Sequence, residues 1–269
     1  MSNKIKILIA GGCFPVQDNI TPDKLYHQIL KNQLQKLNDI DLEIRIVRYE
    51  RIKKSFSQIS EAVSIDKPDL ILFHLRTEPM LLPARLFCKY HDRDGNLVKK
   101  INMSAFGLGP AIKHIQKRET GVRHHLVERS GFRIIIHKML RELNYFTGYI
   151  LGNWSRILKD YLNLVNGIIQ LSRNKNLTLI ITGPVSRPFS YSENRLSEKL
   201  HKYMSRYLRQ CHQVYLSLLG LYDKESDFLF CDDLKRVNET GHKRISEIIY
   251  TAVIRNINHW ENIYKEILS

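Results

Sequence analysis

Short apolar runs alternate with longer amphipathic segments along this chain of 269 residues, and this alternation restricts the fold more than any other feature. The run from Ile5 to Ala10 is almost entirely apolar and ends in glycines, as expected of a buried parallel strand that leads into a tight loop. A helix is predicted next, because Thr21, Pro22 and Asp23 supply an N-cap, a first-turn proline and an early acidic residue. The first unit is therefore a strand followed by a helix.

The same unit is predicted to repeat along the chain. The further strands are residues 42–48, 69–74, 177–181 and 228–230. The further helices are residues 57–63, 155–171, 193–219 and 241–254. Strands that alternate with helices form a parallel sheet covered on both faces. We therefore predict one three-layer α/β domain over residues 1–269, with its ligand crevice at the carboxyl ends of the strands.

Residues 80–150 interrupt this alternation. An Asp94-Gly95 turn between two short runs predicts a hairpin. From Arg85 to Arg141 there are 13 basic and 4 acidic residues, a net charge of +9 out of +15 for the whole chain. We predict that residues 80–150 form a basic, helical insertion that caps the carboxyl ends of the strands.

The positive charge predicts attraction to an anionic partner, such as an anionic or carrier-bound substrate, an acidic carrier protein, a membrane surface or nucleic acid. A solvated basic surface is the alternative. Nucleic acid is disfavoured, because no known binding module is present and the aromatic residues are not interleaved with the basic ones.

Several other classes of protein are also disfavoured. The four cysteines have no CxxC spacing and suggest no disulfide framework, which favours the cytoplasm. The N-terminal apolar run is short and is interpreted as a strand, and no window has the roughly 18 to 20 apolar residues of a membrane span. No metal-ligand spacing, P-loop or GxGxxG sequence is present, so we expect neither a metal nor a cofactor.

The segment from Asp233 to His242 resembles the last sequence block of the SGNH (GDSL-type) hydrolases. That block is written Asp-x-x-His-x-Asn-x-x-Gly-His, and Asp233, Asn238 and Gly241-His242 match it. Arg236 stands where the family has its general base. A guanidinium stays protonated at any working pH and cannot act as a base.

Two earlier segments resemble other blocks of the same family. Gly11-Gly12-Cys13 occupies the place of Gly-Asp-Ser, so that Cys13 replaces the serine nucleophile. After the predicted strand at residues 69–74, Arg76 and Glu78 replace the family's Gly and Asn. The resemblance implies an SGNH-hydrolase-like fold with a flavodoxin-like strand order and an activity on acyl groups: that of an esterase, thioesterase or acyltransferase.

The resemblance also implies roles for these residues. Cys13 would be the nucleophile, with His242 or another imidazole as base and Asp233 to orient it. Gly12 and Arg76 would help to form the oxyanion hole, because backbone N–H groups and a guanidinium stabilise a developing negative charge. Three further residues are predicted to bind substrate or the oxyanion, and they are Glu78, Arg236 and Asn238.

Each of these residues also has an interpretation without catalysis. Cys13 would be a small buried residue, His242 would pack at the start of a helix, and Asp233 would form an ion pair with Arg236. Arg76 and Glu78 would form a solvated pair. The alternative hypothesis is therefore an inactive SGNH-like pseudoenzyme that binds an acidic carrier protein or an anionic glycan.

Overall fold

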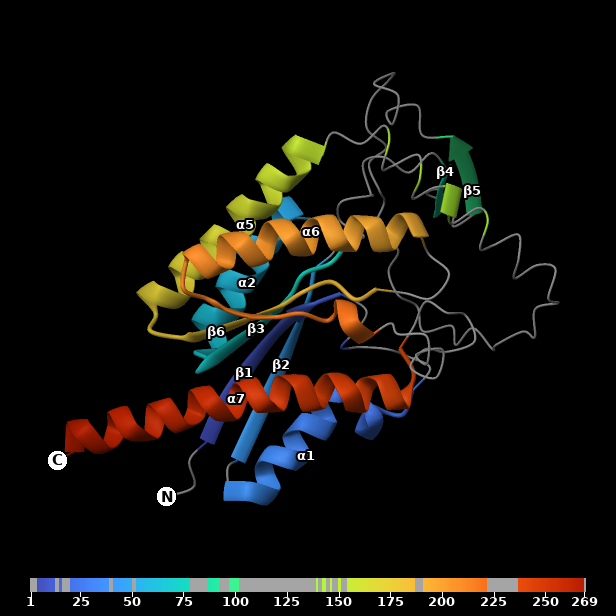
Figure 1. Cartoon of the computed structure of the whole chain (residues 1–269). Coiled ribbons are helices and arrows are strands. Elements are labelled where there is room, and N and C mark those ends of the chain that lie inside the picture. The colour runs from blue at the N-terminus through green and yellow to red at the C-terminus, as the bar shows by residue number, and fades with distance from the viewer. Residues whose placement is uncertain are drawn as a thin grey trace.

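The computed structural model describes residues 4–12, 15, 20–38, 41–49, 52–77, 87–91, 97–101, 139, 142–143, 146, 150, 154–186, 191–221 and 237–268. Five strands form one sheet in the order β2-β1-β3-β6-β7, with every neighbouring pair parallel (Figure 1). They are β1 (Lys4–Gly11), β2 (Asp41–Arg48), β3 (Leu70–His74), β6 (Thr178–Thr182) and β7 (Val214–Leu216). Counted within this sheet the order is 2-1-3-4-5, so the predicted flavodoxin-like order is confirmed.

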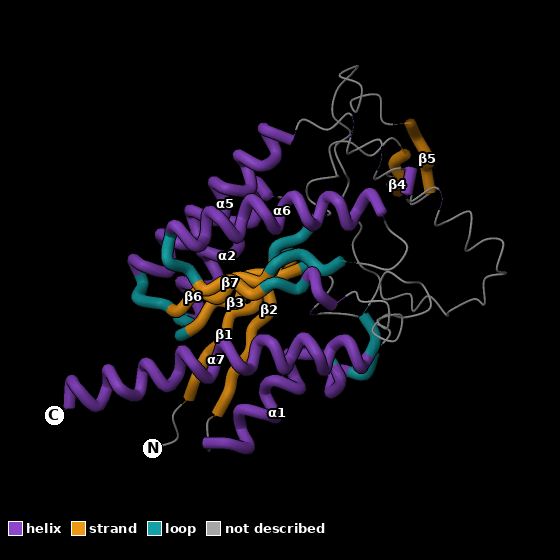
Figure 2. Tube along the Cα trace, in the orientation of Figure 1, coloured by secondary structure: helices purple, strands orange, loops and turns teal. Residues whose placement is uncertain are grey.

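Helices cover both faces of the sheet (Figure 2). One face carries α1 (Tyr26–Asn38) and α7 (Glu239–Leu268), and the other carries α2 (Ile52–Asp66), α5 (Trp154–Asn174) and α6 (Tyr191–Gln210). The predicted three-layer α/β fold is therefore confirmed. No helix in the described part of the chain is long and apolar enough to cross a membrane.

Strand side chains divide between the two cores because successive residues of a strand point to opposite faces. Leu8 and Ala10 belong to the core beneath α2, α5 and α6, and Ile7 and Ile9 belong to the core beneath α1 and α7. The central strand β3 is buried at all five positions. By contrast, β2 lies at the edge of the sheet and has several exposed positions, which agrees with the alternating pattern of its sequence.

The predicted helix over residues 193–219 is wrong at its C-terminal end. Helix α6 stops at Gln210, and β7 begins at Val214. The helix ends in a Schellman arrangement, in which Gln213 N–H donates to the Leu208 carbonyl and the backbone of His212 is left-handed (φ 55°). Glycine usually occupies that position, and because histidine does so here, the sequence gives no stop signal. The predicted strand at residues 228–230 lies outside the described residues.

The hairpin predicted from the Asp94-Gly95 turn is confirmed. Strands β4 (Phe87–His91) and β5 (Leu97–Ile101) pair antiparallel and form a separate two-stranded sheet. Most of the remaining predicted insertion at residues 80–150 lies outside the described residues, so its role as a cap over the strand ends stays a prediction.

Candidate functional site

The carboxyl ends of four strands bring one group of side chains together, at the edge where doubly wound sheets bind ligands. Gly12 follows β1, Tyr49 follows β2 and Arg76 follows β3. His74 and Thr182 are the last residues of β3 and β6 and lie opposite each other in the register. This edge is the candidate functional site.

The guanidinium of Arg76 lies directly against Gly12. A Cβ atom at Gly12 would overlap Cζ and Nε of Arg76, so only glycine leaves room for this contact. Tyr49 holds the guanidinium in place: Arg76 Nη1 donates to the Tyr49 carbonyl oxygen at 2.6 Å, and Arg76 Cζ lies 5.6 Å from the ring centroid, within cation–π range. A positive charge is therefore fixed beside the end of β1.

Two buried tyrosines connect the backbone of Arg76 to β3 through a chain of hydrogen bonds. Arg76 N–H donates to Tyr161 Oη at 2.9 Å, and Tyr161 Oη lies 2.9 Å from Tyr49 Oη. Tyr49 O–H donates to the carbonyl oxygen of His74 at 2.5 Å, so Tyr161 must donate to Tyr49. Because each group donates to the next, the bonds strengthen one another and fix the loop after β3.

His74 is buried, and hydrogen-bond partners lie at both of its ring nitrogens. Nε2 is 2.5 Å from Tyr26 Oη, and Nδ1 is 2.6 Å from Thr182 Oγ1. Burial, then the charge of Arg76 and then His27, lower the pKa of His74 to about 3. The imidazole is therefore neutral near pH 7 and joins α1, β3 and β6.

His242 lies at the start of α7, next to the residue that caps this helix. Asn238 Oδ1 accepts a hydrogen bond from Gly241 N–H at 2.9 Å, which makes Asn238 the N-cap. The His242 ring is fully buried, stacks on Tyr26 and accepts the Tyr26 backbone N–H at Nδ1, at 3.3 Å. Burial, with a smaller contribution from His27, lowers its pKa to about 4. The neutral ring therefore carries its proton on Nε2.

His27 is the third imidazole of this group, and it faces the loop after β1. Its Nε2 lies 2.9 Å from the carbonyl oxygen of Pro15, and a carbonyl can only accept, so Nε2 carries the proton. Nδ1 is then the acceptor, and it is buried without a hydrogen-bond partner in the described structure. Burial lowers the pKa of His27, although the hydrogen bond to Pro15 opposes this effect.

The buried imidazoles predict that acid destabilises the fold. The pKa of a histidine is about 6.5 in the unfolded chain, against about 3 for His74 and about 4 for His242 in the fold. Between these values the unfolded chain binds more protons, so stability is complete above pH 6.5 and falls below it. Below pH 6.5, and down to the pKa of each ring in the fold, we expect His74 and His242 each to lower the free energy of unfolding by roughly 1.4 kcal/mol for every unit by which the pH falls.

Urea unfolding at pH 7.5, 6.5 and 5.5 tests this expectation. His242→Gln serves as the comparison, because it removes one of the titrating groups. Its stability should fall less steeply with acid than that of the parent protein, and identical slopes would contradict the expectation.

The structure describes four of the eight predicted site residues. It brings Gly12 and Arg76 into contact, and it places Asn238 and His242 at the start of α7, where Tyr26 links His242 to His74. The other four lie outside the described residues, so their roles stay predictions: Cys13, Glu78, Asp233 and Arg236. No cluster of three metal-ligating side chains occurs among the residues that the structure describes.

Sequence reasoning missed four residues that build this edge, namely Tyr26, His27, Tyr49 and Tyr161. None of them belongs to a recognisable motif, and their partners are distant in sequence. The weak signal is that Tyr49 directly follows a predicted strand, a place where functional groups gather in this type of sheet. Thr182 follows the predicted strand at residues 177–181, and the sequence predicts it at this edge for the same reason.

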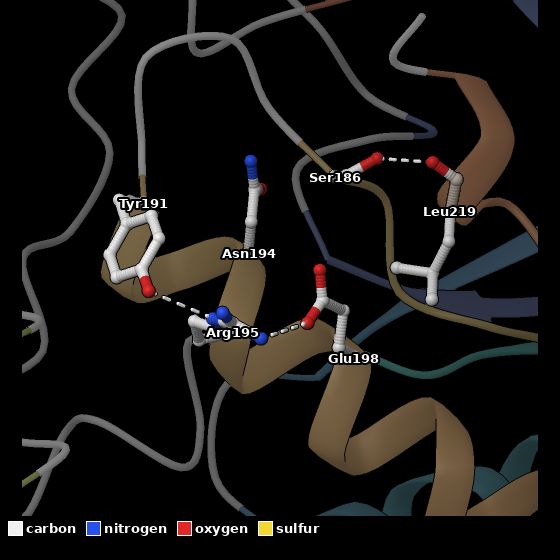
Figure 3. Close-up of a pocket in the computed structure, with 6 residues that line it drawn as sticks. All are labelled: Ser186, Tyr191, Asn194, Arg195, Glu198 and Leu219. Atoms are coloured by element: carbon white, nitrogen blue, oxygen red, sulfur yellow. Dashed lines mark hydrogen bonds and ion pairs between the residues drawn. The ribbon is translucent and has the colours of Figure 1, made fainter.

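A pocket of about 380 Å³ lies at the same edge, between α6 and the segments that follow β6 and β7 (Figure 3). Its lining residues are Ser186, Tyr191, Asn194, Arg195, Glu198 and Leu219. Ser186 O–H donates to the carbonyl oxygen of Leu219, in the short 3-10 helix η5 (Leu219–Leu221), which ties two walls of the pocket together.

The strand order and the helices on both faces define a flavodoxin-like α/β fold, and comparison with solved structures identifies it as SGNH-hydrolase-like. A lipolytic protein of the G-D-S-L family from Desulfitobacterium hafniense has a TM-score of 0.52 at 10% identity, covering 91% of this chain and 98% of its own. A psychrotrophic esterase from Pseudoalteromonas has a TM-score of 0.52 at 11% identity, covering 94% of this chain and 98% of its own.

A family 3 carbohydrate esterase from Clostridium thermocellum has a TM-score of 0.51 at 12% identity, covering 95% of this chain and 99% of its own. The sequence matches no protein-family model and no curated protein. At these identities the likeness shows the fold alone. The predicted SGNH-hydrolase-like fold is thus confirmed, and the chemistry has to be argued from the residues.

Proposed function

We propose that this protein is an acyl-handling enzyme, an esterase, thioesterase or acyltransferase, with Cys13 as its nucleophile. The contact of the Arg76 guanidinium with Gly12, the residue before Cys13, carries this proposal. Because Cys13 directly follows Gly12 in the sequence, we expect this positive charge to lie near its thiol. A nearby positive charge lowers the pKa of a thiol and favours the thiolate, which is the nucleophilic form. The esterases and the lipolytic protein that share this fold add support.

The Cys13 thiolate attacks the carbonyl carbon of an ester or thioester, and the carbonyl electron pair moves to the oxygen. The Cys13 backbone N–H and the Arg76 guanidinium, which lies against Gly12, stabilise this oxyanion. The carbon–oxygen or carbon–sulfur bond then breaks, and the leaving group takes the proton that an imidazole received from Cys13. Water or an acceptor alcohol attacks the resulting thioester and frees Cys13.

Two imidazoles are candidates for the base. His242 is the choice from the sequence, but its Nδ1 accepts the Tyr26 N–H, so this nitrogen can take a proton only if that bond breaks. His27 holds the carbonyl of Pro15, two residues after Cys13, and keeps an acceptor at Nδ1. We therefore propose His27 as an alternative base, with His242 then positioning Tyr26.

The remaining predicted residues keep supporting roles in the proposal. Asp233 orients the base or balances its charge, and Glu78 and Arg236 contact substrate. Asn238 acts through its cap on α7 in addition to the predicted contact with substrate or oxyanion. This chain has a net charge of +15, which attracts anionic molecules. The proposed partners are therefore an anionic or carrier-bound acyl substrate and an acidic carrier protein.

A second candidate is a pseudoenzyme of the same fold that binds an acidic carrier protein or an anionic glycan. The state of His74 and His242 favours it, because both rings are buried, neutral and hydrogen-bonded to structural partners. A pseudoenzyme of this kind would retain the fold and the positive charge of the protein but would not catalyse a reaction.

Alkylation of the thiols tests the first proposal. At pH 7, iodoacetamide should react with Cys13 at least about tenfold faster than with Cys211, which is free and partly buried. Arg76→Met should slow the reaction of Cys13 by about tenfold, because a rise of one pKa unit reduces the thiolate fraction by that factor.

Arg76→Lys is the matched control, because it keeps the charge and should retain much of the rate. Equal, slow labelling of both cysteines, unchanged by Arg76→Met, would refute an activated Cys13. Together with the absence of turnover on esters and thioesters, that outcome would favour the pseudoenzyme.

A further inference from the structure

The pocket beside α6 differs from a pocket for an acyl chain. Acyl chains need mostly apolar walls, but among the described residues that line this pocket Leu219 is the one aliphatic residue. Its other lining groups are a phenol, an amide, a guanidinium, a carboxylate and a hydroxyl. At about 380 Å³ it falls within the usual range for small-ligand sites, roughly 300 to 1,000 Å³. It is therefore suited to the polar part of a ligand.

The charged side chains of the pocket are more than half exposed and contact neighbours on α6. Arg195 Nε lies 3.1 Å from Tyr191 Oη, and Arg195 Cζ lies 5.3 Å from the Tyr191 ring centroid. Arg195 Nη1 lies 3.4 Å from Glu198 Oε2. These contacts join residues one helical turn apart, so the donors and acceptors lie on one face of the helix. Figure 3 shows the side chains of Asn194 and Glu198 pointing from α6 into the same space.

The opposite charges restrict what the pocket accepts. A phosphate or carboxylate placed beside Arg195 would also meet the carboxylate of Glu198, and a cation beside Glu198 would meet Arg195. A neutral group with adjacent hydroxyls avoids both conflicts, because each hydroxyl can donate to Glu198 and accept from Arg195 or Asn194. Tyr191 adds an aromatic ring with 68% of its surface exposed, and the electron-rich face of such a ring attracts C–H groups.

From this combination we infer that the pocket binds a neutral sugar. If the proposed acyl chemistry is correct, the sugar is the alcohol part of the ester, held at the same sheet edge as Gly12 and Arg76. Binding of the sugar itself does not depend on that chemistry, whereas its place in the substrate rests on the proposed function.

Direct binding tests the site. Titration of the full chain with methyl glycosides of glucose, galactose, xylose and N-acetylglucosamine, followed by calorimetry and saturation-transfer NMR, should give saturable millimolar binding of at least one sugar. Tyr191→Ala and Glu198→Gln should each weaken it at least fivefold. Tyr203→Ala is the control, because Tyr203 is a half-exposed tyrosine of the same helix outside the pocket. No binding of any glycoside, or equal loss in the control, would overturn the inference.

Kinetics separate the two levels of the proposal. Tyr191→Ala should raise KM for an acetylated methyl glycoside, whereas the control Tyr203→Ala should leave this KM unchanged. If the parent protein and Tyr191→Ala turn over the sugar ester with the same KM, the sugar site is refuted but the proposed enzyme function is not. Sugar binding without turnover of any ester would refute the proposed function and leave the site in place.

Discussion

Replacing Cys13 by alanine is expected to lower the turnover of acyl esters and thioesters by at least about a thousandfold. Removal of a catalytic nucleophile has effects of this size or larger, because no other group can form the acyl intermediate. A panel of p-nitrophenyl esters and acyl thioesters of increasing chain length gives the rates. The fold should survive, because the substitution is small and the site lies at the sheet edge.

Cys211→Ala provides the matched control, because it removes a thiol that directly follows the C-terminal end of α6, whereas the pocket lies at the N-terminal turns of this helix. Its turnover should equal that of the parent protein. The same assay distinguishes the two candidate bases. If His27 is the base, His27→Gln should lower the rate more than His242→Gln does. If His242 is the base, as the sequence predicts, His242→Gln should have the larger effect. Turnover that persists in Cys13→Ala would exclude the thiol mechanism.

Replacing His74 by leucine is expected to lower the free energy of unfolding by about 3 to 5 kcal/mol. The substitution removes the partner of both Tyr26 Oη and Thr182 Oγ1, which are buried with it. A buried polar group that loses its hydrogen bond costs roughly 1 to 3 kcal/mol, and two are affected here. Urea unfolding at pH 7.5 measures the effect, with circular dichroism to confirm that the variant folds.

Thr182→Val is the graded comparison for this network. It removes one of the two contacts while preserving the shape of the side chain, so we expect a loss of about 1 to 2 kcal/mol. If His74→Leu were no more harmful than Thr182→Val, the bond between His74 and Tyr26 would contribute nothing to stability.

The parts of the fold that depend on local pattern were predictable from the sequence. Strands β1 and β3 were predicted because they are nearly continuous apolar runs. The last helix was predicted over residues 241–254, whereas α7 begins two residues earlier, at Glu239, and continues to Leu268. Strand β7 was not predicted, because it has three residues and because His212, not glycine, is the left-handed residue that follows the end of α6. The helical spacing of apolar residues continues across this boundary.

The candidate site was predictable only where it follows a motif. Gly12 and Arg76 belong to segments with a recognisable pattern, and the structure brings them into contact. Tyr161 was missed because its partners Tyr49 and Arg76 are 112 and 85 residues away in the chain. Contacts over such distances depend on the packing of α5 against the sheet, which no local pattern encodes.

The most direct test of the account is the mass of the protein after brief exposure to p-nitrophenyl acetate and acid quenching. We predict one added acetyl group, located on Cys13 by peptide mapping and removed by neutral hydroxylamine, as expected of a thioester. Cys13→Ala should show no added mass. Ester turnover without an adduct on Cys13, or an adduct that persists in Cys13→Ala, would contradict the account.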